Sequence, residues 1–387
     1  MIDLPLEHFA TIVRGVTFGK SEVAPMPSAG LLPVLRAGSI QGSLLTDKDL
    51  VWVPRERIRD DQLIRKDDIV MCTSSGSADL VGKCAIAEQD WNGSFGAFCA
   101  GIRPRKATCN PTFLYHYLSS PRFRNWSEMS AGANIKNIRA SELASFPVPD
   151  MPLPDQERIG AILNKSAEVR RKRQQTIELS DQLLRSVFLE LFGDFTKRGV
   201  RKVHLGDVVH VDAPMVDPRK DEFLDLVHVG PDRIEKETGR LLSQMTAREE
   251  RLISSKFLFD ERYVLYSKIR PYLKKCALAV GRGLCSADMY PIRPIEGELT
   301  REFLWMLLLS GQFDTYISSL PSRANIPKLN RTELSAFEFW VPDIQSQVKF
   351  SEIVRRTHVF SKSLRNPECS PDKLLGALSQ KAFTGDL

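Results

Sequence analysis

The feature that most constrains this chain is an internal duplication. The segment GANIKNIRASELASFPVPD at 132–150 returns as SRANIPKLNRTELSAFEFWVPD at 322–343. With a shift of 191 positions the shared ANI and EL residues coincide, as do Phe146 and Phe337, and the match continues downstream to Gln156 and Gln347. Upstream, two IRP triplets coincide with a shift of 190. A repeat of about half the chain predicts two copies of one unit, related by a pseudo-two-fold axis and carrying two similar binding surfaces.

Each copy contains two kinds of sequence. Residues 1–150 and 196–343 mix short β-rich runs, such as KCAIAE and RYVLYSKI, with Gly and Pro punctuation and one apolar helix, FLYHYL or FLWMLLL. These two segments are predicted to be compact α/β domains, which makes the fold mixed α+β. Residues 151–195 and 344–387 are predicted to be helical regions that follow the first and the second domain.

The central region predicts one long helix of roughly 55 Å. Between Pro154 and Gly193 the chain has a single glycine and no proline. The apolar residues on heptad-spaced positions are Ile159, Leu163, Ile177, Leu184, Val187 and Leu191. We expect a rod rather than a core helix, packed with the distal helix as an antiparallel coiled coil. RNPECSP at 365–371 should break that distal helix. A pair of such helices could separate two domains by a fixed distance or form a dimerisation coiled coil.

Composition limits the function classes. Hydrophobic residues make up 42% and charged residues 26% of the 387 positions, and no apolar run approaches the length of a membrane span. The N-terminus lacks the order of a signal peptide, so we expect a cytoplasmic protein without a membrane partner. Seven cysteines without a CxxC pair argue against a disulfide framework and a zinc knuckle and predict buried thiols. The net charge of +6 agrees with a polyanionic partner.

The motifs of common enzymes are incomplete in this sequence. GVTFGKS at 15–21 has three residues between its glycines, where a phosphate-binding loop has four. NPTF at 110–113 lacks the second proline of the loop that holds the target amine in amino-methyltransferases, and it is predicted instead to start a helix. The histidines and aspartates between 204 and 228 lack metal-site spacing, and polar strand and turn positions explain them more simply. The chain is therefore predicted to be non-catalytic, with no cofactor or metal of its own.

The two copies diverge most in polar segments inside an apolar frame. SKIRPYLKKCALA at 267–279 gathers cations and a tyrosine, and its counterpart at 73–87, TSSGSADLVGKCAIA, is rich in serine. Such side chains suit phosphate contacts and base-edge readout, although the exposed face of a hairpin would also explain them. The candidates for DNA contact in these segments are Lys83, Lys268, Arg270, Lys274 and Lys275. Two related domains with different polar surfaces should read two different sequences.

Two further groups of polar residues have alternative interpretations. Asn134 and Asn325, in the repeated motif, are candidates for DNA contact, but a structural role in capping the turn into the helix is favoured. The run Arg170, Arg171, Lys172 and Arg173 could face DNA phosphates or simply solvate the helix, and we favour the solvated face.

The chain resembles the specificity subunits of type I restriction-modification systems. The strongest similarity is the central block LPDQERIGAILNKSAEVRRKRQQTIELSDQLLRSVFLELFGD, and KLLGALSQKAFTGDL resembles its distal counterpart. The two ANI-containing segments resemble the ends of target-recognition domains, and LYSKIRPYLKK resembles a segment inside them. The resemblance covers essentially the whole chain.

The resemblance implies a non-enzymatic subunit that binds double-stranded DNA. Each recognition domain would bind one half of a split site, and the paired helices would set the unread gap. Two methyltransferase subunits using S-adenosylmethionine, and restriction subunits using ATP and Mg²⁺, would join it. We expect the methyltransferases to dock on exposed apolar helix positions such as Leu191 and Phe192, although a coiled-coil core would claim the same residues.

Two other functions remain open from the sequence. A stand-alone DNA methyltransferase with one recognition domain would require a cofactor loop and a complete Asn-Pro-Pro-aromatic motif. A structural coiled-coil scaffold would show no affinity for DNA in a salt-dependent binding assay.

Overall fold

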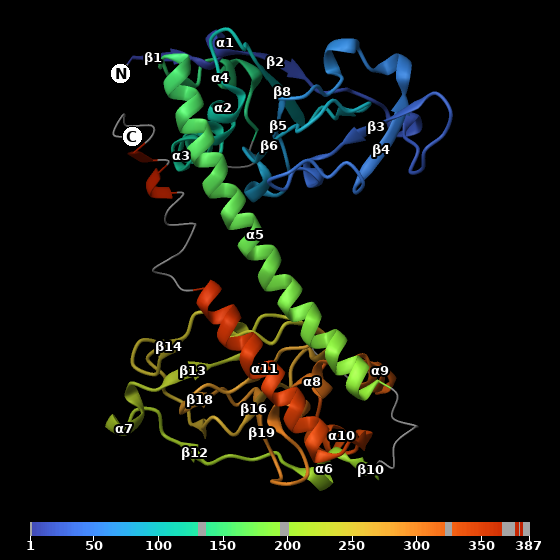
Figure 1. The fold of residues 1–387 in the computed structure, drawn as a ribbon, viewed down its shortest axis with the longest axis vertical. Coiled ribbons are helices and arrows are strands. Elements are labelled where there is room, and N and C mark those ends of the chain that lie inside the picture. Colours follow the sequence, from blue (N-terminus) through green and yellow to red (C-terminus); the bar gives the residue numbers. More distant parts are fainter. Residues whose placement is uncertain are drawn as a thin grey trace. The chain divides into compact units, whose positions relative to one another are not determined.

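The computed structural model describes residues 2–130, 137–193, 201–321, 327–365, 376–378 and 380–381. The chain divides into two compact units, coloured along the sequence in Figure 1. Unit 1 comprises Met1–Arg173 and Asn366–Leu387, and unit 2 comprises Gln174–Arg365. The boundary between the units falls inside the longest helix, α5 (Leu153–Phe192), so each unit contains about one half of this helix.

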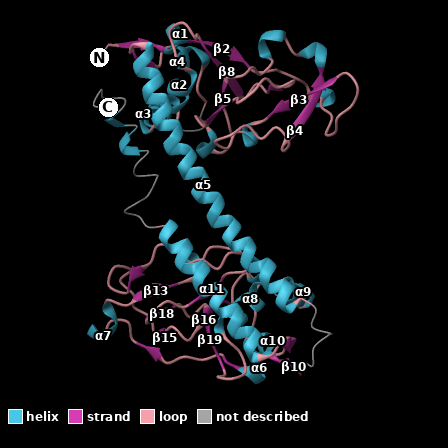
Figure 2. Cartoon of the chain, in the orientation of Figure 1, coloured by secondary structure: helices cyan, strands magenta, loops and turns pink. Residues whose placement is uncertain are grey.

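Unit 1 contains three small sheets with helices beside them (Figure 2). The four-stranded sheet has the order β2 (Ala10–Arg14), β8 (Cys99–Pro104), β5 (Ile69–Cys72) and β6 (Cys84–Ile86). The three-stranded sheet has the order β4 (Leu50–Pro54), β3 (Leu31–Leu35) and β7 (Ser94–Phe95). The third sheet pairs β1 (Asp3–Pro5) with β9 (Pro147–Pro149). The helices before α5 are α1 (Leu6–Phe9), α2 (Pro111–Leu118), α3 (Pro121–Ser130) and α4 (Ala140–Ala144).

Unit 2 repeats this plan. Its four-stranded sheet has the order β11 (Val209–His210), β19 (Met289–Pro294), β16 (Val264–Ser267) and β17 (Cys276–Leu278). Its five-stranded sheet has the order β12 (Met215–Val216), β15 (Lys256–Phe259), β18 (Gly283–Cys285), β13 (Val227–Val229) and β14 (Met245–Thr246). Its third sheet pairs β10 (Arg201–His204) with β20 (Glu338–Val341). The helices are α6 (Leu205–Val208), α7 (Asp221–Leu224), α8 (Arg301–Leu309), α9 (Gly311–Ser319), α10 (Arg331–Ser335) and α11 (Ile344–Leu364).

The strand pairing confirms the duplication and the mixed α/β class. Both four-stranded sheets are antiparallel throughout and have equivalent order. Both second sheets contain one parallel pair, β3 with β7 and β13 with β18, and an antiparallel neighbour on the other side of β3 and β13. Unit 2 adds β12 and β15 at the far edge of that sheet.

The apolar helices fill the cores because they are hydrophobic on nearly every side. In α2 the buried apolar residues include Phe113, Leu114 and Tyr117, which belong to the core of unit 1. In α8 the run from Phe303 to Leu308 is buried in the core of unit 2. NPTF starts α2 as predicted, because the Asn110 side chain accepts a hydrogen bond from the Phe113 N–H at 3.0 Å.

A buried glutamine joins each globular part to its long helix. In unit 1 the Gln156 side chain accepts from the N–H of Asn110 at 2.9 Å and donates to the carbonyls of Thr108 and Met151 at 3.1 and 2.9 Å. In unit 2, Gln347 has the same three contacts, with Thr300, Glu298 and Pro342, at the same distances. Both glutamines are 0% exposed.

The expectation that the central helix is a rod and not a core helix is wrong at both ends of α5. Ile159 and Leu163 are buried in the core of unit 1. Leu184, Phe188 and Phe192 are buried in the core of unit 2. The predicted apolar stripe is buried as far as Leu184, and most of its buried positions face the core of the adjacent unit. In the last turns the buried residues are Phe188 and Phe192 instead of the predicted Val187 and Leu191. The sequence does not show which surface a stripe contacts.

The distal helix α11 packs against the second half of α5 within unit 2. The rings of Phe188 and Phe192 contact the Phe350 ring, with centroids 5.4 and 5.7 Å apart. Figure 1 shows that the two helices run in opposite directions there, which confirms the antiparallel pairing. The helix ends at Leu364, as the prolines of RNPECSP predicted. Residues 366–371 of that segment lie outside the described residues.

The cysteines of the described residues are free and buried, as expected, and Cys369 lies outside that part of the chain. Burial raises the pKa of the Cys84 thiol to about 11. Among the helices of the described residues, none combines the length and apolar character that a membrane span requires.

Candidate nucleic-acid interface

The two polar segments occupy equivalent places in the two units. In unit 1 residues 73–83 connect β5 to β6, and in unit 2 residues 268–275 connect β16 to β17. The carbonyl of Thr73 accepts a hydrogen bond from the N–H of Ile138 at 2.8 Å, and the carbonyl of Lys268 accepts from Leu329 at 2.9 Å. Ile138 and Leu329 are both buried and lie inside the repeated segments, three positions after the ANI triplet.

The repeated segments therefore contain the residues that fasten each polar segment to its unit. Isolated bridges between Ser74 and Asn137, and between Ile269 and Lys328, lie at the same two junctions. The candidates Asn134 and Asn325 lie outside the described residues, so their roles stay a prediction.

Most of the candidate cations of unit 2 already have partners inside the unit. Lys274 forms an ion pair with Asp314 on α9 at 3.1 Å. Lys275 donates to the carbonyl of Pro231 at 2.7 Å. Lys268 lies over the ring of Tyr290, 5.8 Å from its centroid. These side chains hold the segment in place, so DNA contact by Lys274 and Lys275 would cost their present interactions.

Arg270 is the cation of this segment that points to solvent. Its side chain is exposed, and no partner for it is found among the described residues. Its backbone N–H donates to the carbonyl of Pro327 at 2.8 Å. Arg270 and Lys274 both have left-handed backbone conformations, with φ of 48° and 50°. Two non-glycine residues with positive φ around one short turn are uncommon, and such strain is maintained only where the surroundings fix the backbone.

Lys83, the candidate of unit 1, closes the polar segment before β6. Its backbone carbonyl accepts from the N–H of Cys72 at 2.9 Å, and its N–H donates to Leu80 at 3.1 Å. The side chain is half-buried. The exposed residues Gly76, Ser77 and Asp79 precede it. With one acid and one base, the polar segment of unit 1 has no net charge, whereas that of unit 2 contains four cations.

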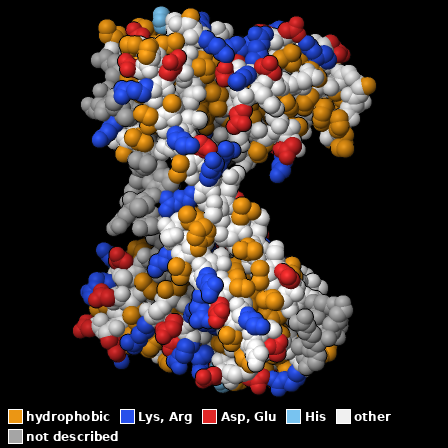
Figure 3. All heavy atoms as spheres, in the orientation of Figure 1, with side chains coloured by type: hydrophobic (Ala, Val, Ile, Leu, Met, Phe, Trp, Pro, Cys, Tyr) orange, Lys and Arg blue, Asp and Glu red, His pale blue; other side chains and the backbone are white. Residues whose placement is uncertain are grey.

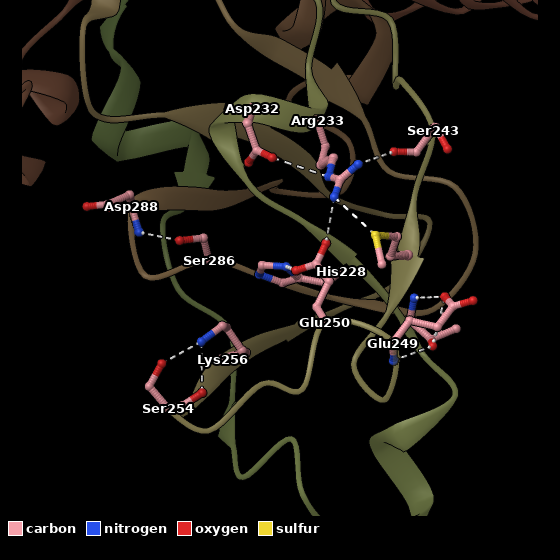
Figure 4. Close-up of polar contacts among 12 residues, drawn as sticks. His228, Asp232, Arg233, Ser243, Glu249, Glu250, Ser254, Lys256, Ser286 and Asp288 are labelled. Atoms are coloured by element: carbon pink, nitrogen blue, oxygen red, sulfur yellow. Dashed lines mark hydrogen bonds and ion pairs between the residues drawn. The ribbon is translucent and has the colours of Figure 1, made fainter.

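Unit 2 also contains a polar cluster within the five-stranded sheet (Figure 4). Glu250 lies between His228 and Arg233 and accepts from both, at 2.7 Å from Nδ1 of the histidine and 3.1 Å from Nη2 of the arginine. Arg233 also reaches Asp232 at 3.2 Å and the carbonyl of Ser243 at 3.1 Å. His228 is thus a hydrogen-bonded strand residue. No group of three or more His, Cys, Asp or Glu suited to a metal ion occurs in the described ranges.

The equivalent position in unit 1 is apolar. In the parallel strands of unit 2, His228 lies opposite Leu284. In the corresponding strands of unit 1, Val34 lies opposite Ser94, so Val34 is the counterpart of His228. Val34 is fully buried in a small apolar cluster. The two units therefore differ both in their exposed segments and in the polarity of their second sheet.

The basic run in the middle of α5 is exposed from Arg170 to Lys172. Figure 3 shows Lys and Arg side chains along this part of the helix. Lys172 pairs with Glu168 one turn earlier at 2.7 Å. Hydrogen bonds from Lys172 and Lys165 lower the pKa of Glu168. Intrahelical pairing of this kind agrees with the solvated face that the sequence favoured, and contact with phosphates stays an open alternative.

The two candidates for partner docking have opposite environments. Leu191 is 39% exposed, as a docking residue requires. Phe192 is only 2% exposed and packs against Phe188, Phe303 and Phe350, so the expectation that it is an exposed position is wrong. The alternative that a helix-packing core would bury these residues is correct for Phe192, because the last turn of α5 packs into the core of unit 2.

Sequence reasoning missed two kinds of residue. Gln156 and Gln347 were matched in the duplication, but their function as clamps was not inferred. Two aligned glutamines at the start of the two long helices were the available signal. Phe98 was not considered at all, although it is an aromatic residue beside the polar segment with 67% of its surface exposed. Its place becomes visible only when strands distant in sequence are paired.

Comparisons with known proteins agree with this geometry. The family model of the type I restriction modification DNA specificity domain matches residues 6–179. The StySPI specificity subunit of Salmonella potsdam is 25% identical over 420 residues, which cover 99% of this chain and 88% of that protein. The EcoKI specificity subunit of Escherichia coli strain K12 is 37% identical over 161 residues, which cover 41% of this chain and 34% of that protein.

Solved structures share the fold. The S subunit of a type I restriction-modification system from M. genitalium superposes with a TM-score of 0.62 at 16% identity, covering 98% of this chain and 95% of that one. A chain from a structure that addresses complex assembly of the type I R-M system superposes with a TM-score of 0.52 at 17% identity, covering 100% and 98%. The matched DNA specificity domain and the similarity along 99% of the chain relate this protein to the specificity subunits of type I restriction-modification systems, and the solved structures show the shared fold.

Proposed function

We propose that this specificity subunit reads a bipartite DNA site, with one half-site for each unit. The observation that supports this most is the duplication itself. Two units with equivalent sheets, clamps and junctions carry polar segments of different chemistry, neutral in unit 1 and basic in unit 2. A conserved frame with divergent contact residues suits the reading of two different sequences.

The helices would set the unread gap between the half-sites. One continuous helix of 40 residues begins in unit 1 and ends in unit 2. At 1.5 Å per residue it is about 60 Å long, which is enough to keep two recognition surfaces about one DNA turn, roughly 34 Å, apart. In this arrangement both half-sites face the same side of the duplex.

The chemistry would reside in the partners. Methyltransferase subunits, two in our proposal, would carry S-adenosylmethionine and dock on the helices through exposed apolar residues such as Leu191. Restriction subunits would carry ATP and Mg²⁺. This chain would contribute no catalytic residue, and it would work in the cytoplasm.

Sequencing of modified adenines tests the proposal. The chain is purified with its methyltransferase partner and incubated with genomic DNA and S-adenosylmethionine, and the modified positions are mapped. We expect one motif made of two short specified parts around an unspecified gap of fixed length. Methylation within a continuous motif, or no dependence of methylation on this chain, would contradict it.

A further inference from the structure

Two short connections between sheets, called tips below, occupy equivalent positions in the two units. In unit 1 residues 96–98 connect β7 to β8, and in unit 2 residues 286–288 connect β18 to β19. The N–H of Gly96 donates to the carbonyl of Leu35 at 3.0 Å, and the N–H of Ser286 donates to Val229 at 3.0 Å. The strand connections and these hydrogen bonds show that Phe98 in unit 1 and Asp288 in unit 2 occupy equivalent positions.

Each tip is fastened to the polar segment of its unit through the carbonyl of its last residue. The carbonyl of Phe98 accepts from the N–H groups of Thr73 and Ser74 at 2.9 and 3.1 Å, and from the Thr73 hydroxyl at 3.1 Å. The carbonyl of Asp288 accepts from the N–H of Lys268 at 3.0 Å. The backbone of each tip is therefore fixed beside the residues that are candidates for DNA contact.

The side chains at the two tips have opposite chemistry. Phe98 is 67% exposed, and no aromatic ring of the described residues stacks on it. Asp288 is half-buried; its N–H donates to the Ser286 hydroxyl at 3.2 Å, as Figure 4 shows, and its carboxylate has no ion-pair partner in the described part of the chain. Three hydrogen bonds to the backbone carbonyl fix the position of Phe98, and packing of its exposed ring does not.

We propose that Phe98 is a specificity-determining residue of unit 1, which contacts the 5-methyl group of a thymine in the half-site that this unit reads. This inference rests on the proposed function. A phenyl ring can neither donate nor accept a conventional hydrogen bond. Among the groups that base pairs present in the major groove, the thymine methyl is the apolar one. Asp288 gives unit 2 a hydrogen-bond acceptor at the same place, so the two units differ in the base chemistry they can detect there.

Replacement of thymine by deoxyuridine, which removes only the methyl group, tests the contact. Dissociation constants of the assembled methyltransferase complex are measured at one salt concentration on duplexes carrying one such replacement at a time. One replacement, in one half-site, should weaken wild-type binding about fourfold, the value expected for one buried methyl group. Phe98→Ala should bind the thymine duplex about fourfold more weakly and no longer distinguish the two duplexes. Phe98→Leu, which keeps an apolar side chain, should still distinguish them.

Two variants serve as controls. Ile2→Ala removes another exposed apolar side chain of unit 1 and should keep the wild-type discrimination. Asp288→Ala changes the tip of unit 2 and should also keep the wild-type discrimination between thymine and deoxyuridine. Discrimination that persists in Phe98→Ala, or a wild-type complex that never distinguishes thymine from deoxyuridine, would overturn the inference. A wild-type complex without a bipartite site would instead overturn the proposed function, so the two failures are distinguishable.

Discussion

The buried glutamine clamp of unit 2 gives the most direct test of how a long helix is joined to its domain. Gln347 lies in the first turn of α11, is 0% exposed, and makes three hydrogen bonds to backbone groups of two other segments. Its acceptor oxygen satisfies the N–H of Thr300, the residue that caps α8. Gln347→Ala removes all three hydrogen bonds and leaves one N–H and two carbonyls in a dry environment.

The expected loss can be estimated from these contacts. Each hydrogen bond contributes about 1 kcal/mol net, and an unsatisfied buried group costs about 1–3 kcal/mol. Three bonds therefore give a loss of about 3 kcal/mol in the free energy of unfolding if water enters the vacated space, and a larger loss if it stays dry. With a urea m-value of about 2 kcal/mol/M, the midpoint of unit 2 should fall by about 1.5 M.

The assay is urea unfolding followed by tryptophan fluorescence, because unit 2 contains the buried Trp305. Gln345→Ala is the matched control: this glutamine is exposed in the same turn, and its loss should change the free energy by less than about 0.5 kcal/mol. Gln156→Ala should produce the same loss in unit 1. A midpoint for Gln347→Ala equal to that of Gln345→Ala would refute the clamp.

Further predictions concern packing, DNA contact and pH. Phe192→Ala should lower the free energy of unfolding of unit 2 by about 3–5 kcal/mol, whereas Leu191→Ala should change it by about 0.5 kcal/mol or less; equal urea midpoints would contradict this difference. Arg270→Ala should weaken DNA binding by the assembled complex and reduce its salt slope by about one, whereas Lys274→Ala should leave the slope unchanged in anisotropy titrations. Burial lowers the pKa of His116 from 6.5 to about 4. The unfolded chain therefore binds the proton first as the pH falls, and up to about 3 kcal/mol of stability that is present above pH 6.5 should be lost by about pH 4. His116→Gln should abolish the part of the pH-dependent loss of stability that is due to this histidine. Urea midpoints measured between pH 6.5 and about pH 4 check this.

The sequence predicted what depends on repetition and periodicity. The duplication, the break after Leu364 and the long helix were visible because they depend on residue order alone. The start of α2 directly after Asn110 was predicted from the NPTF motif. These features need no knowledge of which distant segments meet.

Features that depend on distant partners were missed or misjudged. Lys274 looked like a free cation because its partner Asp314 lies forty positions away, on a helix whose orientation the sequence does not show. Phe192 looked exposed because the surface that covers it is built from Phe303 and Phe350. Phe98 is brought to the polar segment by pairing between strands that the sequence does not specify.

The same contacts explain how recognition can vary while the fold is maintained. The clamps at Gln156 and Gln347 and the hydrogen bonds made by Ile138 and Leu329 use backbone partners, so they are independent of the side chains in the polar segments. Phe98 is also fastened through its carbonyl group, which any residue possesses. A substitution at the tip therefore changes the group presented to DNA without removing a hydrogen bond of the frame. This separation between backbone anchoring and side-chain readout is what two copies of one unit need in order to read different sequences.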